Sequence, residues 1–175
     1  MTFPRSPFLV LPWALLGTGL PAVGQSFEEA VRHNLAAAVE YCVRGGPGMQ
    51  AWIDSFVAAG FGYSRRGDPG VEVYHRFQAP ADTVSAEIYD GQMAPDCRVE
   101  TAYLGVTEAI PLVGEMLARH FPGRFERGGI GPQTPCTGYI DRSRALPETI
   151  TFTNAREEAA CVEDGTTQIF VSSGP

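Results

Sequence analysis

Three histidines are the side chains best suited to acid–base chemistry near neutral pH in this sequence. His33 and His120 fall on helical patterns, whereas His75 lies on the apolar side of an alternating, strand-like segment. If the chain is a hydrolase, we expect His75 to work with Glu87 or Glu100. Strand alternation counts against this pairing, because His75 faces the predicted core while both glutamates face the other side of the sheet. We therefore assign no catalytic residue.

Other catalytic and nucleotide-binding patterns are missing from the sequence. It contains no G-x-S-x-G elbow, no H-E-x-x-H pair and no aspartate-rich calcium loop. All 13 basic residues are arginine, which excludes a P-loop lysine, a Schiff-base lysine and a Ser-Lys dyad. Gly60-Phe61-Gly62 has the beginning of a dinucleotide fingerprint, but it follows a helical pattern instead of a strand. We expect no cofactor.

The four cysteines are predicted to form two disulfides. They are Cys42, Cys97, Cys136 and Cys161. An even number of cysteines is typical of exported proteins, and four of them allow three pairings. We favour 42–97 and 136–161, because these two bridges tie neighbouring segments without crossing. The cysteines are too far apart in sequence for a C-x-x-C knuckle, so we expect neither a metal site nor a redox-active pair.

The candidate binding residues are aromatic or basic, or lie in a glycine-rich loop. Tyr74 and Tyr89 would lie on the outer face of the predicted sheet and offer contact area to a partner. The glycine-rich segment around Gly129 would expose backbone amides to an anion, with Arg124 and Arg127 nearby. The alternative interpretation of this loop is a flexible connection between a helix and a strand.

Three strand-like segments, 71–77, 84–89 and 97–103, alternate apolar with polar residues. Short turns join them, so they predict an antiparallel meander with one face toward water. The charged residues on that face are Glu72, Arg76, Glu87, Arg98 and Glu100. We interpret them as cross-strand ion pairs in preference to an active site.

Helices are predicted where apolar residues recur at spacings of three and four. The first covers 27–43, with Ser26 as N-cap and Glu29 in the capping-box position. The second begins at Met49 and stops at Gly60. The third covers 107–121.

More strands are predicted towards the C-terminus, over 136–141 and 149–153, together with a hairpin over 161–171 that turns at Asp164-Gly165. Runs of strands separated from runs of helices predict an α+β domain. We expect an antiparallel sheet of roughly five to seven strands, with about three helices packed on one face and disulfides that stabilise it.

The N-terminal residues have the order of a secretory signal peptide. Arg5 precedes a short apolar run over 8–16, and small residues follow it near Gly24. The run is shorter than the roughly 20 apolar residues that span a bilayer. We therefore expect residues 1–24 to be removed, and 25–175 to form one domain in the periplasm or outside the cell, with no stable membrane insertion.

The net charge of −7 argues against binding to nucleic acid or to anionic lipid. The use of arginine without lysine is typical of a GC-rich bacterial genome. The sequence therefore predicts an exported, non-catalytic bacterial protein that binds a periplasmic protein or a small ligand. A small periplasmic hydrolase that uses His75 or a carboxylate pair is the first alternative. A structural subunit of an envelope assembly is the second.

Overall fold

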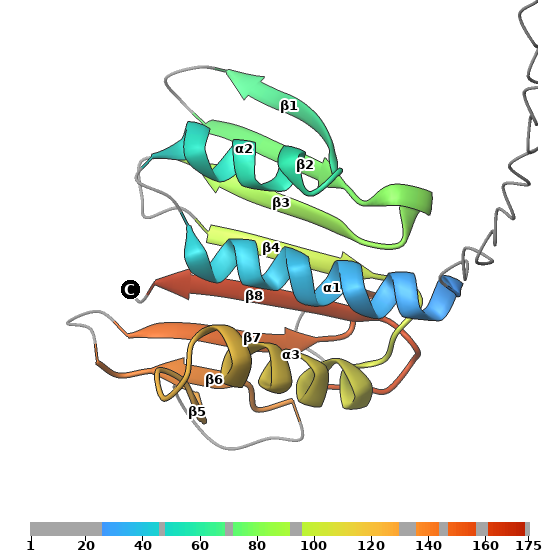
Figure 1. The fold of residues 1–175 in the computed structure, drawn as a ribbon, viewed down its shortest axis with the longest axis vertical. Coiled ribbons are helices and arrows are strands. Elements are labelled where there is room, and N and C mark those ends of the chain that lie inside the picture. Colours follow the sequence, from blue (N-terminus) through green and yellow to red (C-terminus); the bar gives the residue numbers. More distant parts are fainter. Residues whose placement is uncertain are drawn as a thin grey trace, which may run out of the picture.

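The computed structural model describes residues 26–45, 48–68, 72–91, 96–129, 136–143, 147–156 and 161–173. Within these ranges the chain forms three α-helices and an eight-stranded antiparallel sheet (Figure 1). The helices are α1 (Phe27–Arg44), α2 (Met49–Ala58) and α3 (Val106–His120). The strands are β1 (Gly62–Asp68), β2 (Glu72–Gln78), β3 (Ser85–Asp90), β4 (Asp96–Thr101), β5 (Glu126–Arg127), β6 (Tyr139–Asp141), β7 (Glu148–Thr153) and β8 (Thr167–Ser173). The predicted α+β class is confirmed, but the sheet has more strands than the sequence predicts.

The sheet consists of two halves with the same connectivity that meet at its centre. Its strand order is β1-β2-β3-β4-β8-β7-β6-β5, and every neighbouring pair is antiparallel. In each half four consecutive strands lie side by side, and a helix precedes the run: α1 with α2 in the first half, α3 in the second. The sequence shows no repeat, so the relation between the halves lies in their topology.

All three helices lie on the same face of the sheet (Figure 1). α1 contacts the central strands β4 and β8 as well as α3, α2 contacts β1, and α3 contacts β7 and β8. None of these helices, in the ranges described, is long and apolar enough to span a membrane. We call the face that carries the helices the covered face and the other the open face.

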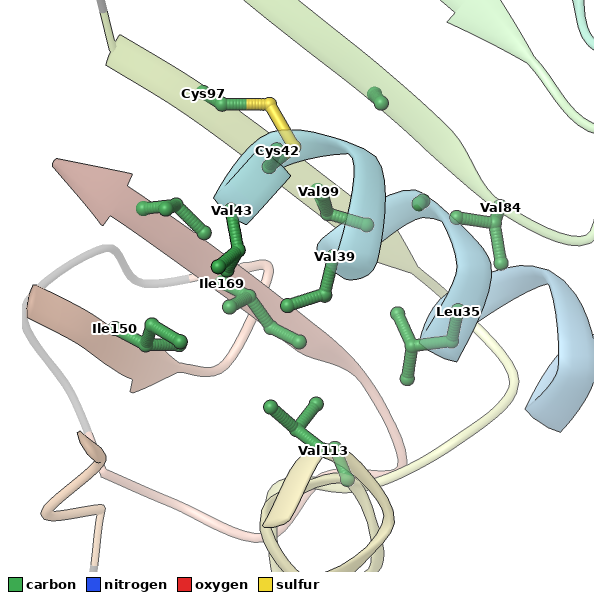
Figure 2. Packing of buried hydrophobic residues seen from close by; sticks show 14 of the residues in the cluster. Leu35, Val39, Cys42, Val43, Val84, Cys97, Val99, Val113, Ile150 and Ile169 are labelled. Carbon is green, nitrogen blue, oxygen red and sulfur yellow. A yellow bond between two sulfur atoms is a disulfide. The ribbon is translucent and has the colours of Figure 1, made fainter. Parts of the chain in front are cut away.

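The core lies between the helices and the covered face. Leu35 and Val39 of α1 and Val113 of α3 point toward Val99 of β4 and Ile169 of β8, which are direct cross-strand neighbours (Figure 2). All five side chains are fully buried. Burial of an aliphatic side chain of this size stabilises the fold by about 1.5–3 kcal/mol. The apolar spacing that predicts the helices is thus also what holds them on the sheet.

The start of α1 is capped as its sequence predicts. The hydroxyl of Ser26 accepts a hydrogen bond of 3.2 Å from the backbone N–H of Glu29, whose carboxylate accepts one of 2.9 Å from the backbone N–H of Ser26. This reciprocal pair satisfies two backbone donors that the first turn of a helix leaves free.

Both predicted disulfides are confirmed. Cys42 of α1 is bonded to Cys97 of β4, with the Cα atoms 5.7 Å apart and both residues buried. This bridge ties the main helix to a central strand (Figure 2). Cys136 is bonded to Cys161, with the Cα atoms 5.6 Å apart. That bridge ties the segment before β6 to the segment before β8.

The edge strand β1 is not predicted by the sequence pattern. Every one of its residues is exposed, so its sequence lacks the alternation of apolar and polar residues that marks a half-buried strand. Arg65 and Arg66 charge this edge, a feature that discourages pairing with other chains. Gly67, at φ +103°, lies near the turn into β2.

The predicted hairpin at Asp164-Gly165 is wrong. Residues 161–166 form no strand, and β8 begins only at Thr167. The carboxylate of Asp164 accepts hydrogen bonds from the backbone N–H and the hydroxyl of Thr166, at 2.9 and 2.6 Å. Such local side-chain bonds compete with strand pairing. β8 pairs instead with β7, the strand before it, and with β4, which is distant in sequence.

Candidate functional site

Cross-strand register arranges the side chains of the open face in rows. Arg76 of β2 is directly opposite Glu87 of β3, which is in turn directly opposite Arg98 of β4. One row away, Tyr74 is directly opposite Tyr89. Residues between these positions point to the covered face. The prediction that charged residues gather on one face of the meander is therefore confirmed.

A hollow of about 470 Å³ opens on this face over β1 to β4. Its charged lining residues are Arg66, Arg76, Glu87, Arg98 and Glu100. Ser64, Gln78 and Ser85 add hydroxyl and amide groups. Pockets of about 300–1,000 Å³ are typical of sites for small molecules. Three arginines and two glutamates leave the lining with one excess positive charge.

Glu87 lies at the centre of these charges. Its Oε2 atom is 3.3 Å from Nη2 of Arg66 and 2.9 Å from Nε of Arg76. The Glu87 side chain is 16% exposed, against 58% and 56% for the two arginines. Exposed ion pairs of this kind contribute about 0–1 kcal/mol each, so they are readily exchanged for other partners. The cross-strand ion pairs expected from the sequence are confirmed.

Contacts with β8 position the other two charged groups. The guanidinium carbon of Arg98 lies 5.2 Å from the centre of the Phe170 ring, within the range of a cation–π contact. Nε2 of Gln168 donates a hydrogen bond to Oε1 of Glu100. Nη1 of Arg98 is also 3.8 Å from Oε1 of Glu100. These contacts fix both side chains at the side of the hollow next to the centre of the sheet.

Tyr74 and Tyr89, two of the predicted binding residues, form a pair beside the hollow. Their ring centres are 5.3 Å apart, and the guanidinium carbon of Arg66 is 5.0 Å from the Tyr74 ring centre. The Tyr74 hydroxyl donates a hydrogen bond of 3.3 Å to Glu72. The two rings pack on each other, and Tyr74 packs under Arg66, which lines the hollow, whereas neither tyrosine is among the lining residues.

His75 lies on the covered face, away from Glu87 and Glu100, as strand alternation predicts. Its Nδ1 atom is 2.9 Å from the Tyr63 hydroxyl, and its Nε2 atom is 3.8 Å from a carboxylate oxygen of Asp90. Burial lowers the pKa of His75, and the nearby carboxylate of Asp90 only partly offsets this effect. The acidic neighbour of His75 is thus Asp90, which sequence reasoning did not identify.

Arg124, a third predicted binding residue, belongs to a buried ion-pair network. Its Nε atom is 2.7 Å from Oδ2 of Asp141, and Nη2 contacts the carboxylate of Glu148. Burial alone would raise the pKa of Asp141, but hydrogen bonds from Ser143 and Arg124 outweigh it and lower the pKa to about 2. These contacts give Arg124 a structural role.

Arg127 and Gly129 complete the predicted binding residues, and both lie in or after β5, at the opposite end of the sheet from β1. The guanidinium carbon of Arg127 is 5.3 Å from the Tyr139 ring centre. Gly129 directly precedes residues outside the described ranges. The structure thus does not bring Arg124, Arg127 and Gly129 together with the tyrosine pair.

Sequence reasoning also missed Ser64 and Arg66, because it missed β1. A signal is present: Gly67-Asp68-Pro69-Gly70 is a turn sequence, and Ser64 and Arg66 alternate before it. A turn that joins this segment to the next strand would have placed both residues on the open face.

Comparison of the chain with family models, with curated proteins and with solved structures finds no match. The geometry of the open face is therefore the observation from which a function is proposed.

Proposed function

We propose that this chain is an exported, non-catalytic bacterial protein that binds a partner or a small ligand at the open face of its sheet. The observation that carries the proposal is the hollow of about 470 Å³, which charged and polar side chains from four neighbouring strands line. A paired sheet holds these groups in place before binding, which reduces the entropy lost when a ligand is bound. His75, the best candidate base in the sequence, faces away from this hollow.

Export is supported by the two disulfides, since such bridges persist mainly in oxidising compartments. The order of residues 1–24, basic, then apolar, then small, adds independent support from the sequence. The periplasm and the space outside the cell both fit these two features.

The proposal is tested by NMR on ¹⁵N-labelled, oxidised protein purified after export from an expression host. A panel of small acidic, basic and neutral polar molecules is added, each to about 10 mM. We expect at least one of them to shift amide signals of β1 to β4 at open-face positions such as Ser64, Gln78 and Ser85. Shifts confined to the helices, or none with any compound, would contradict binding of small molecules at this face.

A protein partner is tested by capture from periplasmic extract with two forms of the bait. Wild-type protein is compared with Arg76→Glu, which reverses a charge in the hollow and leaves the covered face unchanged. One stoichiometric partner that wild type retains and the variant loses would support the proposal. A partner that both forms retain would place the interface elsewhere.

A hydrolase is the second candidate, and the contacts of His75 with Tyr63 and Asp90 are the observation that favours it. A base within hydrogen-bond reach of a hydroxyl, with a carboxylate near its other ring nitrogen, resembles the arrangement that activates many nucleophiles. Turnover of an ester, amide or glycoside substrate that is abolished by His75→Ala and unaffected by Arg76→Gln would replace the binding proposal.

A further inference from the structure

We infer that the hollow on the open face takes the anionic group of a small polar molecule, a carboxylate or a phosphate, at Arg66 and Arg76. The inference rests on the proposed function and names the ligand chemistry of the same site. It follows from how the charges of the hollow are paired.

The two arginines have more donors than their shared acid accepts. Nη2 of Arg66 and Nε of Arg76 both approach one atom, Oε2 of Glu87. A guanidinium carries five N–H donors; the approach of Arg76 to this carboxylate is through Nε, and among the described residues its terminal nitrogens make no hydrogen bond. In the described ranges Arg76 has no second acidic partner. Its terminal nitrogens are therefore available to a carboxylate or phosphate that enters the hollow.

The local charge of the hollow opposes that of the whole protein. The lining carries one excess positive charge, whereas the chain carries a net charge of −7. The field of the whole protein repels long polyanions, but over a few ångströms the nearby guanidinium groups dominate. This combination favours a small anion over a nucleic acid or an anionic membrane.

Uncharged groups in the same hollow fit the remainder of a polar ligand. Ser64 is directly opposite Arg76, and Ser85 is directly opposite Gln78, so these three polar residues line the hollow at positions next to the arginine on the same face. The amide nitrogen of Gln78 donates to the backbone carbonyl of Val84, which holds the amide in place. Hydroxyl groups next to the acidic group of a ligand would find both donors and acceptors here.

Glu87 acts in this arrangement as an internal competitor of the ligand. Its carboxylate accepts a hydrogen bond from Arg66, forms an ion pair with Arg76 and is itself only 16% exposed. Glu87→Gln keeps the shape of the side chain but removes the charge that neutralises the arginines. If the arginines bind an anion, this variant must bind it more tightly. If the arginines only stabilise the sheet, Glu87→Gln must instead weaken any binding that depends on the sheet.

The experiment titrates the oxidised, exported protein with glucuronate, with glucose and with inorganic phosphate, followed by ¹⁵N amide shifts. Glucuronate and glucose share a hydroxylated ring and differ in the carboxylate, and phosphate supplies an anion alone. We expect saturable shifts around the hollow with glucuronate, phosphate or both, and none with glucose. Which of the two binds distinguishes a carboxylate site from a phosphate site.

Variants assign the binding to the named residues. Arg76→Gln and Arg66→Gln are each expected to weaken anion binding by about tenfold, as expected for a lost charge-assisted hydrogen bond, and Glu87→Gln to strengthen it several-fold. Arg65→Gln is the matched control, because Arg65 is the neighbour of Arg66 on β1 but pairs with His75 on the covered face. It should bind like wild type.

Two outcomes would overturn the inference. If glucose shifts the open face as strongly as glucuronate does, or if Glu87→Gln weakens binding as Arg76→Gln does, the hollow binds something other than an anionic group, and binding at the open face still stands. If the probes and the wider panel all leave the open face unshifted, the proposed site for small ligands fails as well.

Discussion

The hydroxyl oxygen of Tyr63 lies 2.9 Å from Nδ1 of His75, and this contact joins the exposed edge strand β1 to β2 on the covered face. Nε2, the other ring nitrogen, is buried and makes no hydrogen bond among the described residues. Burial lowers the pKa of His75, the carboxylate of Asp90 raises it, and the guanidinium of Arg65 lowers it. The net effect favours a neutral imidazole in the folded protein.

Stability should therefore fall in mild acid because of His75. Its pKa is lower in the folded protein than the 6.5 of the unfolded chain, so the unfolded state binds more protons below about pH 6.5. The free energy of unfolding is expected to decrease as the pH falls through this region. Urea denaturation at about pH 7.5 and pH 5.5 measures the decrease, which should be smaller in His75→Gln. His33→Gln, on an exposed helix position, should behave like wild type.

Arg124 should be essential for stability. Its guanidinium is shared by Asp141 and Glu148, both buried and directly opposite each other on β6 and β7. Arg124→Gln leaves two buried carboxylates side by side without that cation, and we expect a loss of about 3 kcal/mol or more in the free energy of unfolding. Chemical denaturation measures the loss, with the exposed Arg127→Gln as control.

The same network sets the acid limit of the fold. The pKa of Asp141 is about 2, below the ordinary value of 3.8, so its stabilising contribution is complete above about pH 4 and is lost as the pH falls toward 2. In Arg124→Gln the burial of Asp141 persists while one of the bonds that lowers its pKa is gone. This variant should consequently begin to lose stability at a higher pH than wild type. Equal acid midpoints would show that Arg124 does not set the pKa.

The parts of the fold that follow from the sequence are those in which one face is apolar. A periodic apolar stripe predicts the helices that contain Leu35 and Val113 and the strand that contains Val99. β1 has no such stripe, since every residue in it is exposed, and so it could be predicted only from the turn that follows it. The prediction of a hairpin at Asp164 is wrong because a local hydrogen bond to the Asp164 carboxylate, and not strand pairing, orders this segment.

The candidate site was visible in the sequence only in part. The alternation of Arg76, Glu87 and Arg98 predicted a charged row, and the structure confirms it. What the sequence did not show is that β1 extends this row with Ser64 and adds Arg66 in the next row, so that these two residues complete the lining of a hollow. That step depends on an edge pairing, and edge pairings carry little hydrophobic signal.

The disulfides should differ in how much they stabilise the protein. The 42–97 bridge closes a loop of 55 residues and the 136–161 bridge one of 25, which corresponds to about 4 and about 3.5 kcal/mol in the loop-entropy description. Replacement of Cys42 and Cys97 by alanine also removes two buried sulfur atoms from the core, which adds to its cost. We expect the double variant at 42 and 97 to have the lower urea midpoint. A lower urea midpoint for the double variant at 136 and 161 would contradict this prediction.

Gly67 offers a direct test of the edge strand on which the candidate site depends. Its φ of +103° suits glycine, and a Cβ atom there would lie 2.3 Å from the backbone oxygen of Glu72. Gly67→Ala should therefore distort the β1–β2 pairing and lower the free energy of unfolding by about 1–3 kcal/mol. Gly62→Ala is the control, since a Cβ there meets only Gln78 O at an ordinary 3.7 Å. Because Ser64 and Arg66 reach the hollow only while β1 is paired, Gly67→Ala should also weaken anion binding. If both variants unfold and bind like wild type, β1 does not pair in this register.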